Sequence, residues 1–198
     1  MNETMKKITQ ISAWLTIILF VSRCFIGQGD LIANSDNLMR CAYSIFGYAG
    51  EAIGVTVLLV ILFNRFLWKW KPLNFILGKE PVLAKKYQGS IIYNYNNQKK
   101  AKKVEAEISQ TFLNVKITLT SDESHSSAIV ASIETVNNEK QLIYTYHNVP
   151  NSTVQDKSPI HYGTAILSID NQANLTGNYY TGRCTRGQIK LKVVKTKH

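Results

Sequence analysis

The chain contains few of the residues from which catalytic and metal sites are usually built. Only 3 cysteines and 4 histidines occur among its 198 residues. His125, His147 and His161 stand too far apart for the paired ligand patterns of metal sites. No glycine-rich phosphate loop and no nucleophile elbow is present. The sequence therefore predicts no catalytic residue, no metal site and no cofactor, and we expect a protein that is not an enzyme.

The scarcity of cysteine also argues against a disulfide framework. Cys184 falls in the half of the chain that we expect to be cytoplasmic, where a thiol stays reduced. Cys24 and Cys41 fall toward the same end of two predicted helices. A bridge between these two stays open, because it depends on geometry that the sequence does not contain.

Acidic residues are in the minority, and the imbalance is uneven along the chain. The 23 lysines and arginines exceed the 13 aspartates and glutamates, which gives a net charge of +10. In residues 1–64 the charges cancel, with Lys6, Lys7, Arg23 and Arg40 against Glu3, Asp30, Asp36 and Glu51. The excess therefore belongs to residues 65–198, which predicts attraction to an anionic partner such as a lipid surface, a nucleotide or a nucleic acid.

Two long apolar runs occur, at residues 8–27 and 41–63, and each approaches the roughly 20 residues that a helix needs to cross a bilayer. No comparable run follows them. We therefore expect a two-helix transmembrane hairpin over 1–64, a juxtamembrane linker over 65–86 and a separate domain over 87–198. A cleaved signal peptide explains the first run less well, because no small-residue cleavage pattern follows it.

Basic residues flank the two runs on one side of the predicted hairpin. Lys6 and Lys7 precede the first run and Arg65 and Lys69 follow the second, whereas the intervening loop holds a single arginine. The positive-inside rule therefore places both termini, and the domain that follows the linker, in the cytoplasm.

The second run contains Gly50, Glu51 and Gly54, which are candidates for membrane assembly. Glycines four positions apart leave a groove at which another helix can approach closely. A carboxylate near the bilayer centre costs at least ~2.5 kcal/mol, so Glu51 needs a partner. Two interpretations stay open: an ion pair with Arg23 on the first helix, or a polar contact between protomers. We expect Pro72 to end this helix and to begin either a short surface helix or a simple linker.

Residues 87–198 alternate between apolar and polar positions with the period of two that is typical of strands. We expect an antiparallel meander of about eight strands that closes into a small barrel able to hold one ligand. The predicted fold class is thus a membrane α-hairpin plus an all-β domain. A change of parity predicts a bulge or corner at 109–112, and the lysine-rich stretch 99–103 is expected in a hairpin loop. The expected strands are 87–95, 103–109, 112–120, 126–136, 140–147, 159–170, 174–184 and 187–195.

Polar and aromatic residues share the inward parity of several predicted strands, where a plain core would need only Val, Ile and Leu. Tyrosine offers a flat face for base stacking and a hydroxyl group, and arginine offers a planar fork suited to phosphate oxygens. These residue types predict a site for a small anionic aromatic ligand. The candidate ligand-binding residues are Arg183, Tyr179, Thr181, Thr185, Tyr144 and Tyr93.

Less specific interpretations of these residues also stay open. Arg183 could be neutralised near one end of the barrel by a carboxylate, from Glu105, Glu107 or Glu134. The tyrosines could be ordinary core residues or exposed strand residues.

Nearly the whole chain resembles the CD-NTase-associated two-transmembrane β-barrel effectors of CBASS antiphage defence. The resemblance rests on the two apolar spans, on the Trp/Lys junction after them, and on Gln110-Thr111, Ser126-Ser127, 161–164 and above all 177–187. It implies a barrel that binds a cyclic dinucleotide made by a partner CD-NTase, with no role for a DNA or RNA polymer. Binding would drive homo-oligomerisation of the helices in the bacterial inner membrane, disrupt the bilayer and kill the infected cell in an abortive infection.

Two further functions fit the same architecture. One is a membrane-anchored lipocalin-like carrier of a lipid or other apolar ligand, which would favour a barrel lined only by Val, Leu and Phe. The other is a barrel hydrolase that uses His161 or His125, although turn composition explains the polar residues around His125 better.

Overall fold

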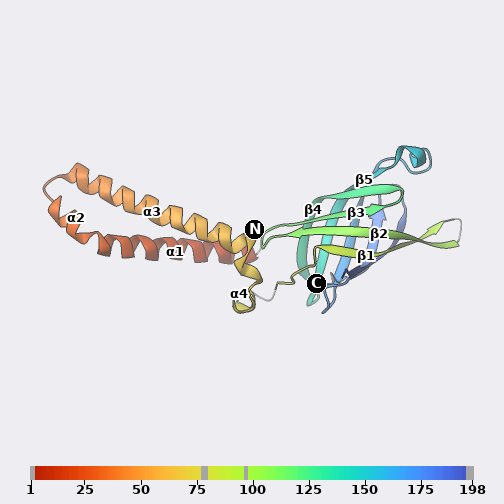
Figure 1. The fold of residues 1–198 in the computed structure, drawn as a ribbon, viewed down its shortest axis with the longest axis horizontal. Coiled ribbons are helices and arrows are strands. Elements are labelled where there is room, and N and C mark those ends of the chain that lie inside the picture. The colour runs from red at the N-terminus through yellow and green to blue at the C-terminus, as the bar shows by residue number, and fades with distance from the viewer. Residues whose placement is uncertain (1–2, 77–79, 96–97, 195–198) are drawn as a thin grey trace. The chain divides into compact units, whose positions relative to one another are not determined.

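A computed structural model describes residues 3–76, 80–95 and 98–194. The chain divides into two compact units, Met1–Gly78 and Lys79–His198. The first unit is helical and the second is a β-barrel (Figure 1). Each unit is described by itself below.

The helical unit is a hairpin of two long antiparallel helices. Helix α1 spans Glu3–Ile26 and helix α3 spans Leu38–Arg65, and a short helix α2, Gln28–Ala33, lies between them. The windows Met5–Ile26 and Leu38–Arg65 are long and apolar enough to cross a membrane. The two predicted apolar helices are thus confirmed, and α2 forms within the stretch expected to be a loop.

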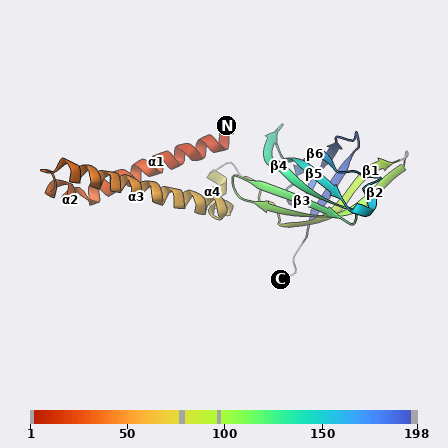
Figure 2. The same cartoon turned by 90° about the horizontal axis from the view of Figure 1, so that it is seen from above.

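The two long helices pack through one face of α3. Tyr48, Ala52 and Thr56 are its buried residues, and they recur every four positions, so they lie on one side of the helix. Thr16 of α1 hydrogen-bonds Thr56 across the contact, with 3.0 Å between the hydroxyl oxygens. Figure 2 shows the helices lying together toward α2 and diverging toward the N-terminus of α1.

The expectation that Pro72 ends the second helix is wrong. Helix α3 already ends at Arg65, and a 3₁₀ turn, η1 (Leu67–Lys69), follows it. Pro72 instead stands in the first turn of α4, Lys71–Ile76, where its missing N–H costs no helical hydrogen bond. The helical alternative for this stretch is therefore the one that forms.

The second unit is a closed barrel in the order β1-β2-β3-β4-β5-β6-β7-β8, and β1 also pairs with β8. Every pair of neighbouring strands is antiparallel, so the predicted meander and its closure are confirmed. The strands are β1 (Lys86–Tyr95), β2 (Gln98–Gln110), β3 (Val115–Ser121), β4 (Ser124–Val136), β5 (Glu139–Pro150), β6 (His161–Ile169), β7 (Leu175–Thr181) and β8 (Arg186–Val193).

Two local expectations for the first strands differ from the structure. The parity change near 109–112 marks the end of β2 and the turn before β3, and the register shift of the barrel lies instead in β4, between Ala128 and Val130. The lysine-rich stretch 99–103 is not a loop. It continues β2, where Lys99 and Lys103 pair with Asn94 and Ser90 of β1, because the antiparallel ladder extends to Gln98.

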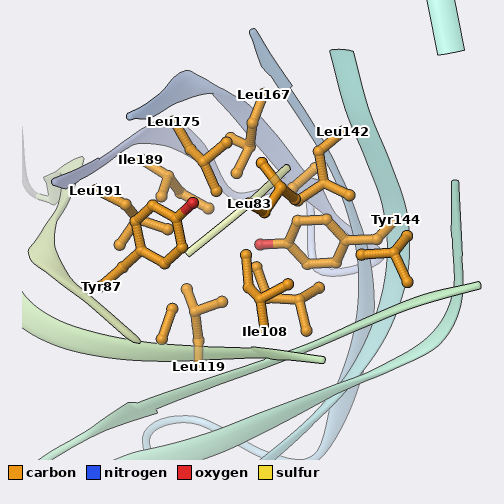
Figure 3. Packing of buried hydrophobic residues seen from close by; sticks show 14 of the residues in the cluster. Leu83, Tyr87, Ile108, Leu119, Leu142, Tyr144, Leu167, Leu175, Ile189 and Leu191 are labelled. Atoms are coloured by element: carbon orange, nitrogen blue, oxygen red, sulfur yellow. The ribbon is translucent and has the colours of Figure 1, made fainter. Parts of the chain in front are cut away.

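The end of the barrel at which the chain enters is filled by a hydrophobic core. Leu142, Leu167 and Leu175 are fully buried there, and Tyr87 is 1% exposed (Figure 3). The Tyr87 hydroxyl accepts a hydrogen bond from the Ala84 backbone N–H at 3.0 Å and donates one to the Ala173 carbonyl at 2.9 Å. These bonds tie the segment before β1 to the turn between β6 and β7 and close this end.

The segment before β1 is also held by side chains. Glu80 pairs with Lys140 at 2.8 Å, and the Gln110 side chain accepts from the Leu83 N–H and donates to the Pro81 carbonyl, both at 2.8 Å. The buried Leu83 side chain packs into the core (Figure 3). The segment that precedes β1 is therefore already part of the packed barrel domain.

Replacing Leu167 by alanine should lower the free energy of unfolding of the barrel by about 2–5 kcal/mol, because it leaves a cavity among fully buried side chains. The measurement is urea unfolding of the full chain in detergent, followed by β-sheet circular dichroism. Ile166→Ala is the matched control, since its neighbour Ile166 points outward and is 39% exposed. Equal losses in the two variants would contradict the assigned core.

Candidate functional site

The other end of the barrel, formed by the turns β1–β2, β3–β4, β5–β6 and β7–β8, differs chemically from the core; we call it the mouth. Polar residues occupy inward positions near it, although the buried Leu119 lies directly opposite Ser126. Ser126 donates to the Asn148 side chain at 2.7 Å, and Asn148 is 6% exposed. Gly163 pairs with Tyr146, and Gly187 pairs with Tyr179 and Tyr93. The interior thus grades from an apolar closed end to a polar mouth.

Tyrosines occupy the middle of the barrel toward the mouth. Tyr144 and Tyr146 of β5 are 3% and 7% exposed, with ring centres 5.8 Å apart. A Cβ atom at Gly163 would collide with the Tyr146 hydroxyl, and one at Gly187 would collide first with the Ile92 backbone carbonyl and then with the Tyr179 ring. The close approach of these rings, and at Gly187 of the neighbouring backbone, therefore requires glycine at both positions.

Three tyrosines of the barrel, Tyr144, Tyr146 and Tyr179, have a raised pKa, and a neighbouring tyrosine contributes to each rise. Burial raises the pKa of Tyr144 and of Tyr146, and Tyr146 adds to the rise at Tyr144. Burial also raises the pKa of Tyr179, which in turn raises that of Tyr146, and Tyr93 raises that of Tyr179. These couplings place the predicted residues Tyr93, Tyr144 and Tyr179 in one group with Tyr146.

The hydroxyls of this tyrosine group are not used by the fold. Within residues 80–95 and 98–194, no hydrogen bond joins the hydroxyl of Tyr93, Tyr144, Tyr146 or Tyr179 to another protein group. None of these four hydroxyl oxygens is among the fully buried polar atoms without a partner in the described residues, so each stays accessible. Each can both donate and accept one hydrogen bond or more. The group therefore presents a set of accessible polar contacts to whatever enters the barrel.

The predicted residues Thr181 and Thr185 frame the turn between β7 and β8 at the mouth. Their hydroxyl oxygens lie 2.6 Å apart. The Thr181 hydroxyl also accepts from the Arg183 and Thr185 backbone N–H groups at 3.3 and 3.2 Å. Thr181 is half-buried and Thr185 is exposed. The pair thus belongs to the rim of the mouth and not to the tyrosine group.

Arg183 does not project from a strand, as the parity argument assumed. Strand β7 ends at Thr181, and Cys184 adopts a left-handed backbone (φ 60°) that closes the turn. The Arg183 side chain is exposed and reaches the β5–β6 connection, where it donates to the Ser158 hydroxyl at 2.8 Å and the Lys157 carbonyl at 3.2 Å. It thus joins two of the connections at the mouth.

The alternative of a carboxylate partner for Arg183 has no counterpart in residues 3–76, 80–95 and 98–194. Arg183 forms no ion pair there with the glutamates considered for it; Glu107, for example, pairs with Lys86. The same residues contain no cluster that could hold a metal ion. His125 instead hydrogen-bonds Thr120 on the outer wall, at 3.1 Å.

Sequence reasoning missed three inward polar residues near the mouth. Besides Ser126 and Asn148, the half-buried Lys102 of β2 pairs with Glu123 at 2.8 Å, which lowers the pKa of that carboxyl. The signal that could have found them is the inward parity of a polar residue within a strand, which the parity argument applied only to Tyr, Thr and Arg.

In the helical unit the intrachain interpretation of Glu51 is the one that forms. The Arg23 Nε donates to the Glu51 carboxylate at 2.6 Å, and the guanidinium lies over the Tyr48 ring at 4.2 Å. Gly50 and Gly54 lie away from this contact, since a Cβ atom at either would meet nothing within 4 Å. The cysteines Cys24, Cys41 and Cys184 are all free.

Two comparisons bear on this architecture. Residues 79–193 match the family model described as "Cap15, cyclic dinucleotide receptor domain". The chain is also 34% identical over 196 residues to "CD-NTase-associated protein 15" of Staphylococcus schleiferi, an alignment that covers 98% of this chain and 100% of that protein. The family match begins just before the first strand and ends at the last, so it covers the closed barrel.

The free energy of unfolding of the barrel should fall as the pH rises above about 10. The unfolded chain then loses tyrosine protons near the ordinary pKa, whereas Tyr144 and Tyr146 keep theirs because burial raises their pKa. Each should contribute a slope of about 1.4 kcal/mol per pH unit. Denaturant unfolding at pH 9 to 11 measures it.

Phenylalanine substitutions test whether Tyr144 and Tyr146 cause this decline in the free energy of unfolding. Tyr144→Phe and Tyr146→Phe should each make this alkaline decline shallower, because the residue can no longer ionise in the unfolded chain. Tyr180→Phe, at a tyrosine that is 50% exposed, should leave the decline unchanged. An equal effect of all three substitutions would contradict the buried positions of Tyr144 and Tyr146.

Proposed function

The chain belongs to the Cap15 family of CBASS-associated cyclic dinucleotide receptors, and on that premise we propose that it is a membrane effector in which a ligand in the barrel controls assembly of the helices. The ligand is a cyclic dinucleotide made by a partner CD-NTase after phage infection. Its binding drives the helices of several copies to associate, and their association disrupts the inner membrane and kills the infected cell.

The observation that carries this proposal is the group of tyrosine hydroxyls without protein partners. Tyr144, Tyr146 and Tyr179 are at least partly buried and stand beside the small residues Gly163 and Gly187. Their rings can stack on nucleobases, which contributes about 1–3 kcal/mol per base, and their hydroxyls can hydrogen-bond base edges or ribose. A cyclic dinucleotide supplies both kinds of partner.

The rim of the mouth supplies groups for the phosphates. Arg183 is exposed in the β7–β8 turn, and its two hydrogen bonds to the β5–β6 connection hold the guanidinium at the mouth. A guanidinium binds phosphate oxygens in a planar fork. Thr181 and Thr185 add hydroxyl groups beside it. The proposed ligand thus lies with its bases toward the tyrosines and its phosphates toward the rim.

Orientation in the membrane follows from the flanking charges. Lys6 and Lys7 lie near the start of α1, Arg65 is the last residue of α3 and Lys69 follows it, so the positive-inside rule favours a multi-pass protein with both termini in the cytoplasm. The barrel then lies on the side on which a bacterial second messenger is made, which supports the same proposal.

Assembly is assigned to the face of α3 that carries Gly50, Glu51 and Gly54. The Glu51 side chain is 57% exposed even with Arg23 bound, and exposed charge is costly in the bilayer interior. Gly50 and Gly54 have open space in front of them, so a helix of another copy can approach closely. Association of copies through this face removes the polar pair from lipid.

The lipocalin-like carrier is not favoured. The apolar part of the barrel is a packed core that includes Leu142, Leu167, Leu175 and Leu191, none more than 1% exposed. The half toward the mouth carries tyrosine, serine and asparagine. The proposed effector acts by binding and assembly, with no catalytic residue and no cofactor.

Arg183→Ala should weaken cyclic dinucleotide binding by the full chain in detergent at least tenfold, because a hydrogen bond to a charged group contributes roughly 1.5–3 kcal/mol. Titration calorimetry with a panel of cyclic dinucleotides measures the affinity. Unchanged affinity would remove Arg183 from the site.

Two control variants distinguish direct contact between Arg183 and the ligand from a role of Arg183 in holding the loops at the mouth. Lys192→Ala removes a positive charge from the outer wall of β8 and should leave the affinity unchanged. Ser158→Ala removes one hydrogen bond of Arg183 but keeps the guanidinium, so it should cost less than Arg183→Ala. If Ser158→Ala costs as much, Arg183 acts by holding the two connections together.

Glu51→Leu should leave cyclic dinucleotide binding unchanged and prevent ligand-induced dye release from phosphatidylethanolamine–phosphatidylglycerol liposomes that contain the full chain. The reason is loss of the polar contact between copies. Ile53→Leu, at an exposed neighbouring position, is the control and should leak normally.

The double variant R23L/E51L tests the alternative explanation. It removes both partners of the ion pair, so no charge is left unpaired in the bilayer. If the double variant leaks normally, the loss of leakage in Glu51→Leu is due to the unpaired charge of Arg23. If Glu51→Leu itself leaks normally, Glu51 has no role in assembly.

A further inference from the structure

The outer wall of the barrel carries a groove that the proposed function does not use. It crosses β7, β8 and β1, where Asn178 pairs with Gln188 and Gln188 with Ile92. Its volume is about 350 Å³. We call it the outer groove, and its lining residues are Ile92, Tyr93, Asn94, Lys99, Asn178, Tyr180, Arg186, Gly187 and Gln188.

The outer groove lies on the opposite face of the strands from the tyrosine group. Successive residues of a strand point to opposite faces, so Tyr179 contributes to the interior and Tyr180 to the groove. In the same way Gly187 makes room for the Tyr179 ring inside, while Arg186 and Gln188 on either side of it line the groove. The two sites therefore share strands, and Tyr93, which borders the groove and also acts on Tyr179, is the member of the tyrosine group that both have in common.

Two cations meet in the outer groove with no carboxylate among its lining residues. Arg23, Lys86, Lys102 and Lys140 each pair with a glutamate. By contrast, the side chains of Lys99 and Arg186 form no ion pair or hydrogen bond with any residue that the structure describes. Their charge is thus available to an anion from outside the chain.

The remaining lining residues suit an organic group that carries the anion. Tyr180 is 50% exposed, so one face of its ring is open to stacking. Asn94, Asn178 and Gln188 present carboxamides, which both donate and accept hydrogen bonds. A guanidinium binds a phosphate through a planar fork and an ammonium binds it as a point charge.

We propose that the outer groove is a second binding site, specific for a phosphate ester attached to one ring-sized or glycerol-sized group. Its volume is at the lower end of the range for ligand pockets, which suits a single nucleotide or a headgroup. The ligand is either a nucleotide monophosphate or the headgroup of an anionic phospholipid, since both present the same phosphate chemistry. The site is independent of ligand binding in the barrel.

The experiment uses the full chain in maltoside micelles, labelled with 3-fluorotyrosine and observed by ¹⁹F NMR. The Tyr180 resonance is assigned from its loss in Tyr180→Phe. Adenosine monophosphate and glycerophosphoglycerol are the two probes. We expect a saturable shift of this resonance with one probe or both, and the responding probe identifies the source of the phosphate. No saturable shift with either probe overturns the proposal.

Charge variants test the residues of the groove. K99Q/R186Q should weaken the response at least tenfold, because it removes both charged hydrogen-bond donors. K190Q/K192Q removes the same charge from the exposed face of β8 outside the groove, and should change the affinity less than twofold. Equal weakening in the two variants would mean diffuse attraction to a basic surface and would overturn the site.

A last control separates this site from the proposed function. Arg183→Ala should leave the Tyr180 response intact, because Arg183 bonds to the β5–β6 connection and does not line the groove. The fluorine signals of the other tyrosines report whether each variant keeps its fold. Loss of the Tyr180 response in folded Arg183→Ala would place the phosphate at the mouth and contradict a separate outer site.

Discussion

The pairing of β1 with β8 is the contact on which the rest of the barrel depends. It runs in register from Tyr87 opposite Val193 to Tyr93 opposite Gly187 and leaves the sheet without a free edge. Because the last strand returns to the first, Tyr93 comes within electrostatic reach of Tyr179, 86 positions later in the numbering (179 − 93). The tyrosine group exists only in the closed barrel.

The two ends of the closed barrel also have different roles. At the end where the chain enters, leucines pack without exposure and the Tyr87 hydroxyl is fully used by backbone partners. This end supplies the stability that lets the other end carry tyrosine hydroxyls without a hydrogen-bond partner among the described residues. Toward the mouth, Gly163 leaves room for the Tyr146 ring, and Gly187 leaves room for the Ile92 carbonyl and the Tyr179 ring. The unequal ends suit a small barrel to the role of a receptor.

Much of the fold could be predicted from local patterns, and the errors occur where local patterns end. Two apolar runs of helical length and a period of two are visible within a few residues, so the hairpin and the strands follow from them. The extent of β2 and the end of β7 do not follow from local patterns, because they depend on how far a partner strand extends the ladder. Arg183 shows the consequence: it follows the parity of Tyr179 in the sequence, yet the turn closed by Cys184 directs it to Ser158.

The sequence by itself determined the kind of each element and its chemical character. It contains an apolar hairpin, strands of alternating polarity, an excess of positive charge, and tyrosines and glycines at inward positions of the strands. Side-chain periodicity and composition are properties of the chain alone, so no neighbour is needed to read them. Only the tertiary structure decided the partners. It pairs Arg23 with Glu51 and brings Tyr144 and Tyr179 into one group, and it leaves the Arg186 side chain beside Tyr180 without an ion pair among the residues that it describes. Distances between residues remote in sequence are set by closure and packing, which no local pattern contains.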